Sequence, residues 1–181
     1  MSVLVQLVPV GSAPRNIIRD FTDPIREVFT CEAKITEALG DPKYAFNKDR
    51  KQYHSTAILR RLTALRSKDA AWVLGIADVD LFVPERPYVF GEADRESRTA
   101  IVSLARLRES ATGPLDSEVL RRRGCVEALH EVGHLAGLSH CDETKCIMFF
   151  AATVSDADRK NTVLCNDCRN ELGRMERLAG T

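Results

Sequence analysis

The stretch that decides the fold runs from residue 130 to residue 140 and reads His130-Glu131-Val132-Gly133-His134-Leu135-Ala136-Gly137-Leu138-Ser139-His140. His130 and His134 are four residues apart, so on a helix their imidazoles project from one face and can share one Zn²⁺ ion. Gly137 can end that helix in a left-handed turn, which returns His140 to the same ion. Three neutral ligands leave a fourth position for water, as in catalytic zinc sites, and Glu131 is placed to take a proton from that water. The stretch therefore predicts a helix that carries a catalytic metal site.

Four of the six cysteines follow this stretch directly and form two pairs of chelating spacing. Four residues separate the first pair and two residues separate the second, which is typical of a structural zinc ion held by four thiolates. The predicted ligands of this second zinc ion are Cys141, Cys146, Cys165 and Cys168. Two disulfide bonds or free buried thiols are the alternatives, and an intracellular protein favours the metal. Cys31 and Cys125 have no paired spacing and are predicted to be small buried side chains.

Outward from the histidines, hydrophobic periodicity and turn residues predict an α/β (α+β) fold with a mixed twisted sheet. The motif helix is predicted from residue 116 or 117 to about residue 136, with a capping side chain at its start and Gly137 after its end. Strands are predicted at residues 3–10, 31–39, 72–83, 88–93 and 98–104, and further helices at residues 14–29, 52–65 and 166–178. Asp23-Pro24 is expected to kink or restart the first of these helices.

Length and charge limit the classes of function. The chain has 181 residues, which fits a single domain, and its 26 Lys and Arg balance its 26 Asp and Glu. No excess of positive charge draws it to nucleic acid or to an anionic membrane, and no apolar run approaches the roughly 20 residues that span a bilayer. The first residues lack the basic start and the cleavage site of a signal peptide. We therefore expect a cytoplasmic monomer that binds neither nucleic acid nor membrane and has no long inhibitory pro-segment.

The position of the cysteines predicts how the domain is organised. Residues 1–137 are predicted to form an upper subdomain with the sheet and the motif helix, and residues 138–181 a small lower subdomain. The lower part has few large apolar residues and little core of its own, so the zinc ion bound by its cysteines is expected to stabilise its fold.

The whole pattern resembles the archaemetzincins, a family of metzincin-type zinc peptidases. The three histidines, the four cysteines behind them and Met148 match the family's motif, and Phe90-Gly91-Glu92-Ala93 and residues 103–107 also resemble it. The resemblance covers at least residues 90–168. It implies a metzincin-like fold and a zinc-dependent peptidase that acts on a peptide or protein substrate.

The resemblance also implies a role for each motif residue. The catalytic zinc ion would be bound by His130, His134 and His140, and Glu131 would be the general base and acid. Met148 would lie in a tight turn beneath the imidazoles, whereas without this context it would be an ordinary core residue. Together with the cysteines, these residues predict two zinc ions for each chain.

Substrate preference depends on weaker features. Glu92 is predicted on or just after a strand that, in metzincins, runs along the cleft and pairs with the peptide backbone. Its carboxylate could bind a substrate α-ammonium group, or it could lie in a solvated turn. Because the vertebrate branch of the family is aminopeptidase-like, we expect an aminopeptidase-like activity on short peptides. The alternatives are a catalytically silent or regulatory peptide-binding zinc protein, and a structural protein with two zinc ions, against which the retained Glu131 argues.

Overall fold

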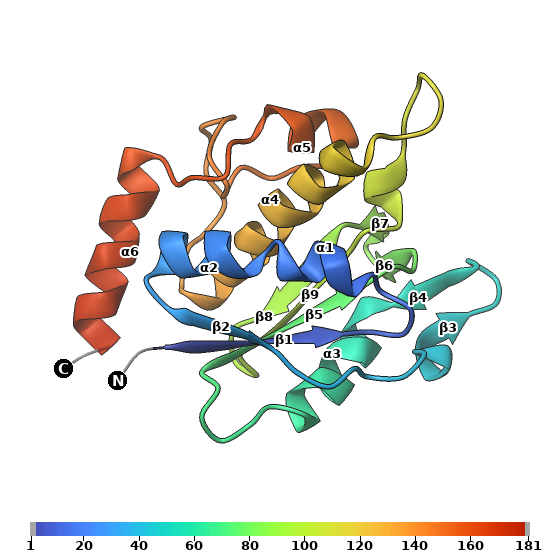
Figure 1. Cartoon of the computed structure of the whole chain (residues 1–181), viewed down its shortest axis with the longest axis horizontal. Coiled ribbons are helices and arrows are strands. Elements are labelled where there is room, and N and C mark those ends of the chain that lie inside the picture. Colours follow the sequence, from blue (N-terminus) through green and yellow to red (C-terminus); the bar gives the residue numbers. More distant parts are fainter. Residues whose placement is uncertain (1–2, 180–181) are drawn as a thin grey trace.

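The computed structural model describes residues 3–179 and places a five-stranded sheet at the centre of the molecule (Figure 1). The strands lie in the order β2, β1, β5, β9 and β8, with the bounds Glu32–Ile35, Leu4–Pro9, Trp72–Ala77, Thr99–Ser103 and Gly91–Asp94. The first four run parallel, and β8 runs antiparallel to β9 at one edge. The predicted mixed sheet is therefore confirmed, and β8 leaves one side of its backbone without a strand beside it in the described chain.

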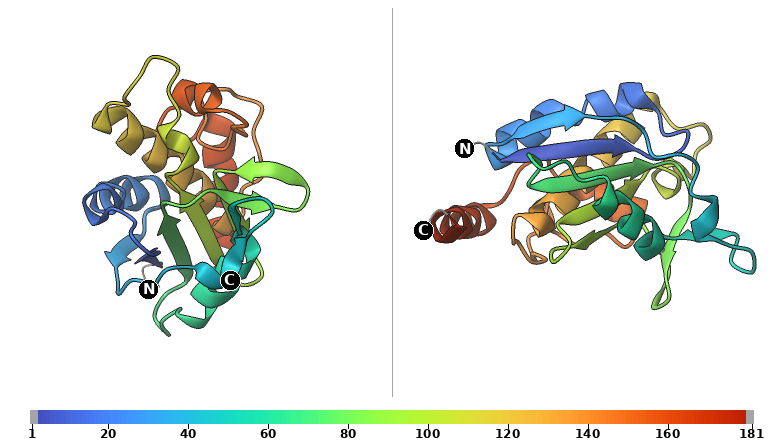
Figure 2. Two further views of the ribbon diagram at one scale, coloured as in Figure 1. Left: turned by 90° about the vertical axis from the view of Figure 1, so that its right-hand side faces the viewer. Right: turned by 90° about the horizontal axis from the view of Figure 1, so that it is seen from below.

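Helices cover both faces of this sheet and so bury its central strands on both sides, as is usual for parallel strands. α1 (Arg15–Arg19), α2 (Thr22–Phe29) and α4 (Ser117–Leu135) lie over one face, and α3 (Ser55–Ala64) lies over the other (Figures 1 and 2). The arrangement is a three-layer α/β/α structure in which α4 crosses the sheet close to β8 and β9.

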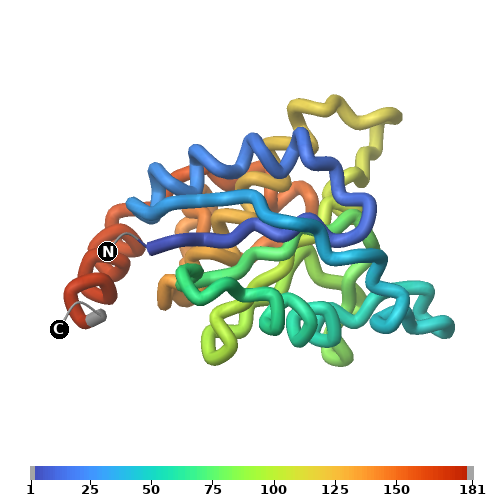
Figure 3. The backbone as a smooth tube through the Cα atoms, turned by 60° about the horizontal axis from the view of Figure 1, so that its bottom comes forward, coloured from blue at the N-terminus to red at the C-terminus, as the bar shows by residue number. Residues whose placement is uncertain are grey.

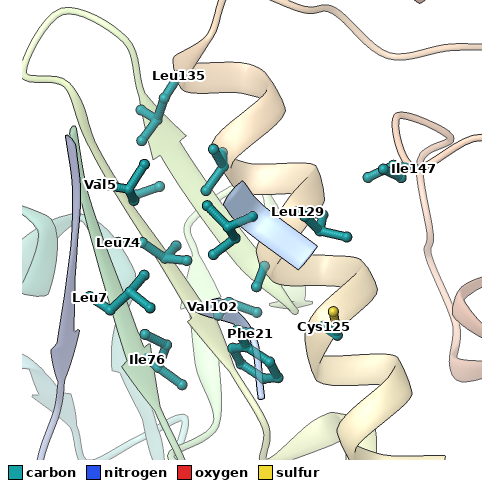
Figure 4. Close-up of a cluster of buried hydrophobic side chains, with 14 of the residues drawn as sticks. Val5, Leu7, Phe21, Leu74, Ile76, Val102, Cys125, Leu129, Leu135 and Ile147 are labelled. Carbon is teal, nitrogen blue, oxygen red and sulfur yellow. The ribbon is translucent and has the colours of Figure 1, made fainter. Parts of the chain in front are cut away.

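The core follows the alternation of side chains along the strands. Val5 and Leu7 of β1 point into the cluster beneath α2 and α4, together with Leu129 (Figure 4). Val8, with the opposite orientation, packs in a second cluster with Ile58 of α3. The alternation thus divides one strand between two apolar layers.

A second, smaller sheet lies beside the main one (Figure 2). Its strands are β3 (Phe46–Asn47), β4 (Gln52–His54), β6 (Leu81–Val83) and β7 (Arg86–Val89), in that order. Phe90 alone separates β7 from β8, so the chain passes directly from the small sheet to the edge of the large one.

The helix α4 matches the predicted motif helix closely. The side chain of Asp116 accepts a hydrogen bond of 2.9 Å from the backbone N–H of Glu118 and so caps the first turn. At the other end Gly137 has a φ of +107°, a conformation that favours glycine. The chain therefore turns sharply after α4, as predicted.

The chain after Gly137 packs onto the same core as the sheet. It forms α5 (Val154–Arg159) and α6 (Asn166–Ala179), the latter ending on the side of the molecule where β1 begins (Figures 1 and 3). Ile147 and Leu164 are buried in the cluster that contains Leu129. The lower part therefore shares the main core; its separate status as a subdomain stays a prediction. No helix within residues 3–179 is long and apolar enough to cross a membrane.

Four predicted elements were wrong in extent. Of the predicted strand 31–39, only Glu32–Ile35 forms a strand. The predicted strand 72–83 is two strands in different sheets, because Asp80 binds Arg106 through two hydrogen bonds of 2.9 and 2.7 Å and the chain turns there. The predicted strand 88–93 likewise divides at Phe90. The predicted helix 52–65 begins at Ser55, because residues 52–54 pair with β6 instead.

The first predicted helix restarts, but at a different residue. The break lies at residues 20–21, between α1 and α2, and Pro24 occupies the first turn of α2, where its missing N–H costs nothing. The short helix α5 was not predicted from the sequence.

Candidate metal centre and cleft

The three histidines of the motif meet at one point. The Nε2 atoms of His130 and His134 are 3.1 Å apart, and one ligand atom from each of His130, His134 and His140 lies within 4.8 Å of the others. Two nitrogens that bind one tetrahedral Zn²⁺ at 2.0–2.1 Å are about 3.3 Å apart. The donor set therefore fits a single zinc ion.

Backbone carbonyls fix the orientation of two of these rings. Nδ1 of His130 lies 2.8 Å from the carbonyl oxygen of Ile147, and Nδ1 of His134 lies 2.9 Å from that of Leu138. A carbonyl can only accept, so each Nδ1 donates and each Nε2 keeps its lone pair for a metal. Burial lowers the pKa of His130 well below its usual value, and the nearby Lys160 charge lowers it further, which favours the neutral ligand form.

Met148 lies against the motif helix where α4 carries Gly133. The Met148 side chain is fully buried, and a Cβ atom added at Gly133 would lie 2.3 Å from its Sδ atom. The backbone N–H of Cys141 donates to the carbonyl oxygen of Met148 at 2.9 Å, which closes the turn beside His140. The structure therefore places Met148 beneath the helix that carries the first two histidines.

Glu131 projects from α4 toward the edge strand β8. The residue is buried, and a Cβ atom added at Gly91 would lie 2.5 Å from its Oε1 atom. Burial raises the pKa of the Glu131 carboxyl well above its usual value, and the neighbouring Glu127 raises it further. A carboxyl group with a raised pKa suits both the uptake and the return of a proton.

The four downstream cysteines also meet at one point. None of them forms a disulfide bond, and one Sγ atom from each of Cys141, Cys146, Cys165 and Cys168 lies within 4.8 Å of the others. The Sγ atoms of Cys141 and Cys165 are 3.7 Å apart, close to the roughly 3.8 Å edge of a tetrahedron with Zn–S distances of about 2.3 Å. Backbone N–H groups of Met148 and Cys165 donate to Sγ of Cys146 at 3.4 and 3.3 Å. The set fits a closed zinc site.

The remaining cysteines are buried in the core, as predicted. Cys31 and Cys125 are 5% and 8% exposed. Burial raises the pKa of the Cys31 thiol to about 11 and that of Cys125 to about 12, so both are unreactive thiols at neutral pH.

A cleft of about 410 Å³ opens over the three histidines. Its walls come from β7, from β8, from the histidine face of α4 and from the chain around Phe150. The hydroxyl of Tyr88 donates to the carbonyl oxygen of Ala152 at 2.6 Å and ties β7 to the segment after the methionine turn. The cleft therefore joins the predicted metal site to the free edge of a strand.

Glu92 is held by the first turn of α3. Its carboxylate accepts hydrogen bonds from the hydroxyls of Thr56, at 2.9 and 3.1 Å, and of Ser55. Glu92 also lines the cleft and is close enough to contribute to the raised pKa of Glu131. The residue is thus beside the cleft, as predicted, but its carboxylate is hydrogen-bonded within the protein.

One buried pair beside the histidines was not predicted from the sequence. Nζ of Lys160 lies 2.9 Å from Oε1 of Glu127 and 3.4 Å from Nδ1 of His130, and both charged side chains are almost fully buried. Glu127 lies one helical turn before Glu131, on the helix face that also carries Arg123 and His130, and this run of polar side chains is the pattern that could have revealed it.

Comparisons with known proteins agree with this geometry. The model of peptidase family M54 matches residues 14–174. The archaemetzincin of Methanocaldococcus jannaschii is 36% identical over 174 residues, which are 95% of this chain and 94% of the relative. The crystal structure of archaemetzincin from Methanopyrus kandleri has a TM-score of 0.86 at 32% identity and covers 97% of this chain and 96% of that one.

A second solved structure extends the comparison. A zinc-dependent peptidase from Methanocorpusculum labreanum has a TM-score of 0.84 at 28% identity, with 93% of this chain and 99% of that chain covered. The family model and the relatives span nearly the whole chain, and the two solved structures share its fold. The chain therefore belongs to peptidase family M54, the archaemetzincins, and is a metallopeptidase.

Proposed function

We propose that the chain hydrolyses peptide bonds in the cleft over its three histidines, with one catalytic and one structural zinc ion. The observation that carries this proposal is the meeting of three imidazole nitrogens within 4.8 Å, with the buried Glu131 beside them in the same cleft. His130, His134 and His140 would hold the catalytic ion. The zinc identity is supported by the fit of the donor atoms and by the zinc-dependent relative.

Each residue of the site has a role in the hydrolysis. A zinc ion held by the three histidines would supply a Lewis acid that polarises the scissile carbonyl and makes water a stronger acid. Glu131 takes a proton from the attacking water and passes it to the nitrogen of the leaving amine. The carbonyls of Ile147 and Leu138 keep two imidazoles in the tautomer that binds metal. Met148 supports the helix below them and has no proton to transfer.

The peptide would lie along β8. Backbone N–H and C=O groups on the outer side of this strand have no strand partner within residues 3–179, and β8 forms one wall of the cleft. An extended peptide can add to such an edge through backbone hydrogen bonds that do not depend on its sequence. This position brings a backbone carbonyl of the peptide over the three histidines.

The cysteine site would support the catalytic site. Cys141 follows His140 directly, so an ion that binds Cys141, Cys146, Cys165 and Cys168 also fixes the backbone that carries the third histidine. A closed set of four thiolates leaves no position for water, which is why this second site would be structural.

Replacing Glu131 tests the proposed activity. Glu131→Ala should keep the fold and both zinc ions, since Glu131 is not a ligand, but it should lower peptide hydrolysis by at least ~10²-fold. Glu118→Ala removes an exposed carboxylate from the first turn of the same helix and should leave turnover unchanged. Hydrolysis of a mixed peptide library would be followed by mass spectrometry.

The outcomes of this test separate the alternatives. Equal turnover by Glu131→Ala and the parent protein would mean that the activity comes from a contaminant. No hydrolysis by the parent protein with two zinc ions bound would favour a regulatory, peptide-binding protein instead.

An aminopeptidase-like preference for short peptides is the finer part of the proposal. Glu92 supports it, because its carboxylate lies in the cleft near Glu131 and forms no ion pair within residues 3–179. The hydrogen bonds from Ser55 and Thr56 count against it, since they already occupy that carboxylate.

Acetylation decides between amino-terminal trimming and internal cleavage. An aminopeptidase should cleave free peptides and spare their N-acetylated forms, because acetylation removes the charge that Glu92 would bind. Glu92→Gln should then weaken this selection while zinc stays bound. Equal cleavage of both forms at internal bonds would refute the aminopeptidase preference and leave the metallopeptidase activity intact. The monomeric state and the cytoplasmic location stay predictions.

A further inference from the structure

Two arginines stand at the two ends of the chain segment that lines the cleft. Arg86 begins β7 and Arg95 follows β8 directly, and both side chains are exposed and line the cleft. Residues 87–93 between them form one cleft wall. An extended peptide that lies along β8 therefore passes both arginines, whichever way it runs.

Arg86 is held beside the third histidine by an aromatic ring. Its Cζ atom lies 4.5 Å from the ring centroid of Phe150, and that ring lies 5.2 Å from the ring of His140. Stacking of this kind orients a guanidinium while its N–H groups stay available. No carboxylate within the described part of the chain forms an ion pair with Arg86.

Arg95 lies beside the second histidine. A Cβ atom added at Gly137 would lie 3.1 Å from its Nη2 atom, so the guanidinium covers the end of α4 just beyond His134. The position suits a cation, because a helix C-terminus carries partial negative charge. Like Arg86, Arg95 has no ion pair with any carboxylate in residues 3–179.

The carboxylates of the cleft do not compensate these two charges. Glu127 is paired with the buried Lys160, and Glu92 accepts hydrogen bonds from hydroxyls of α3. Glu131 is only 4% exposed and is packed against β8. Among the charged groups that line the cleft, the two guanidinium groups are therefore the exposed cations, on either side of the histidines, and Glu92 is the one carboxylate that stays partly exposed.

We propose that Arg86 and Arg95 select peptides that carry carboxylate groups on either side of the cleaved bond. This inference rests on the proposed peptidase function and names its substrate class. A guanidinium binds a carboxylate through a planar pair of hydrogen bonds, which gives both charge and shape selectivity. Acidic side chains and a free peptide C-terminus share this chemistry, and acidic side chains are the source that two separated arginines favour.

A binding measurement tests the selection without depending on turnover. The probes are two blocked octapeptides, acetylated and amidated, that differ only in having Glu or Gln at the four central positions. Their affinities would be measured by calorimetry for the zinc-loaded Glu131→Gln protein. The Glu peptide should bind more tightly, and this advantage should shrink with added salt, since exposed charges are screened.

Variants assign the effect to the two arginines. Arg86→Gln and Arg95→Gln should each reduce the advantage of the Glu peptide about two- to fivefold, the range for exposed charge pairs, and leave the Gln peptide unaffected. Arg60→Gln is the matched control, because it removes the same charge from an exposed position on α3, over the other face of the sheet. Arg86→Glu should weaken the Glu peptide further and improve a matching Lys peptide.

The outcomes separate this inference from the proposed function. Equal binding of both octapeptides, or an equal loss in the Arg60 control, would overturn the inference even if the enzyme cleaves both peptides. A Gln octapeptide with a free C-terminal carboxylate that gains as much affinity as the Glu peptide would show a C-terminal carboxylate to be the ligand and overturn the side-chain assignment. Selective binding without hydrolysis by the parent protein would support the inference and refute the proposed function.

Discussion

Gly133 and Met148 face each other across a gap that admits no further atom. The contact joins the helix that carries two histidines to the turn that follows the third, so it sets the distance between parts of the metal site. Glycine is the residue type with the lowest helix propensity apart from proline, and its use here reflects the space that Met148 needs. The absence of a side chain at Gly133 thus determines how closely α4 and the segment that carries Met148 approach each other.

Replacing Gly133 tests this contact at the residue scale. Gly133→Ala should lower the free energy of unfolding by about 1–3 kcal/mol, because Met148 must move and overpacking exceeds the gain in helix propensity. Gly173→Ala in α6 is the matched control, since the nearest atom to an added Cβ lies 3.5 Å away. It should be neutral or stabilising by up to about 1 kcal/mol. Urea unfolding of both variants, with equal zinc content, would measure this; a stabilised Gly133→Ala would contradict the argument.

At the scale of elements, α4 is fixed to α5 by an ion pair. Arg123 is buried in α4 and donates to both carboxylate oxygens of Asp158 at 2.7 and 2.8 Å, and to the carbonyls of Leu107 and Glu109 at 2.8 Å. The hydrogen bonds from Arg123 hold the pKa of Asp158 below its usual value. The pair therefore connects the motif helix with the chain that leads to the last two cysteines.

The lowered pKa of Asp158 gives a prediction with a defined sign. A carboxyl whose pKa is lower in the folded than in the unfolded state stabilises above its usual pKa, near 4, and loses that contribution as the pH falls through the lowered value. Asp158→Asn should be less stable than the parent protein at pH 7, by only about 1 kcal/mol because the side chain is 41% exposed, and this difference should close below about pH 4. Asp49→Asn is the control at an exposed aspartate, and its difference in stability from the parent protein should not depend on pH in this way. Thermal unfolding at several pH values measures both, and a constant difference would contradict the assignment.

The sequence predicts best those elements whose ends are marked by capping or turn residues. Asp116 and Gly137 mark the ends of α4, so its bounds were predicted within a residue. Periodicity within residues 72–83 could not show that the chain changes sheets. The turn depends on hydrogen bonds from Arg106 and Arg108, which lie far downstream in the sequence. The same limit applies to the site: the histidines and cysteines follow from spacing, whereas the Glu127 and Lys160 pair depends on tertiary contact.

At the scale of the whole molecule, the two predicted metal sites share one backbone segment and one core. His140 and Cys141 are adjacent, and Cys141 forms a β-bridge with Phe149 beyond the methionine turn. Ile147 connects this turn to the main apolar cluster below the sheet. Loss of the cysteine-bound ion would therefore release the segment that carries the third histidine, and metal binding at the two sites is expected to be coupled.

Metal content tests this coupling. Protein purified without chelator should contain close to two zinc ions, and a mild chelator should remove the histidine-bound ion first, because its open position admits a competing ligand. Cys141→Ser should lose the cysteine-bound ion, unfold at a much lower temperature and bind the remaining ion more weakly, since structural zinc contributes directly to folding. Cys125→Ala, at a core cysteine away from both sites, should keep two ions. Elemental analysis and a chelator titration would measure these changes. A Cys141→Ser protein with two ions and unchanged stability would show that the four cysteines do not form a metal site.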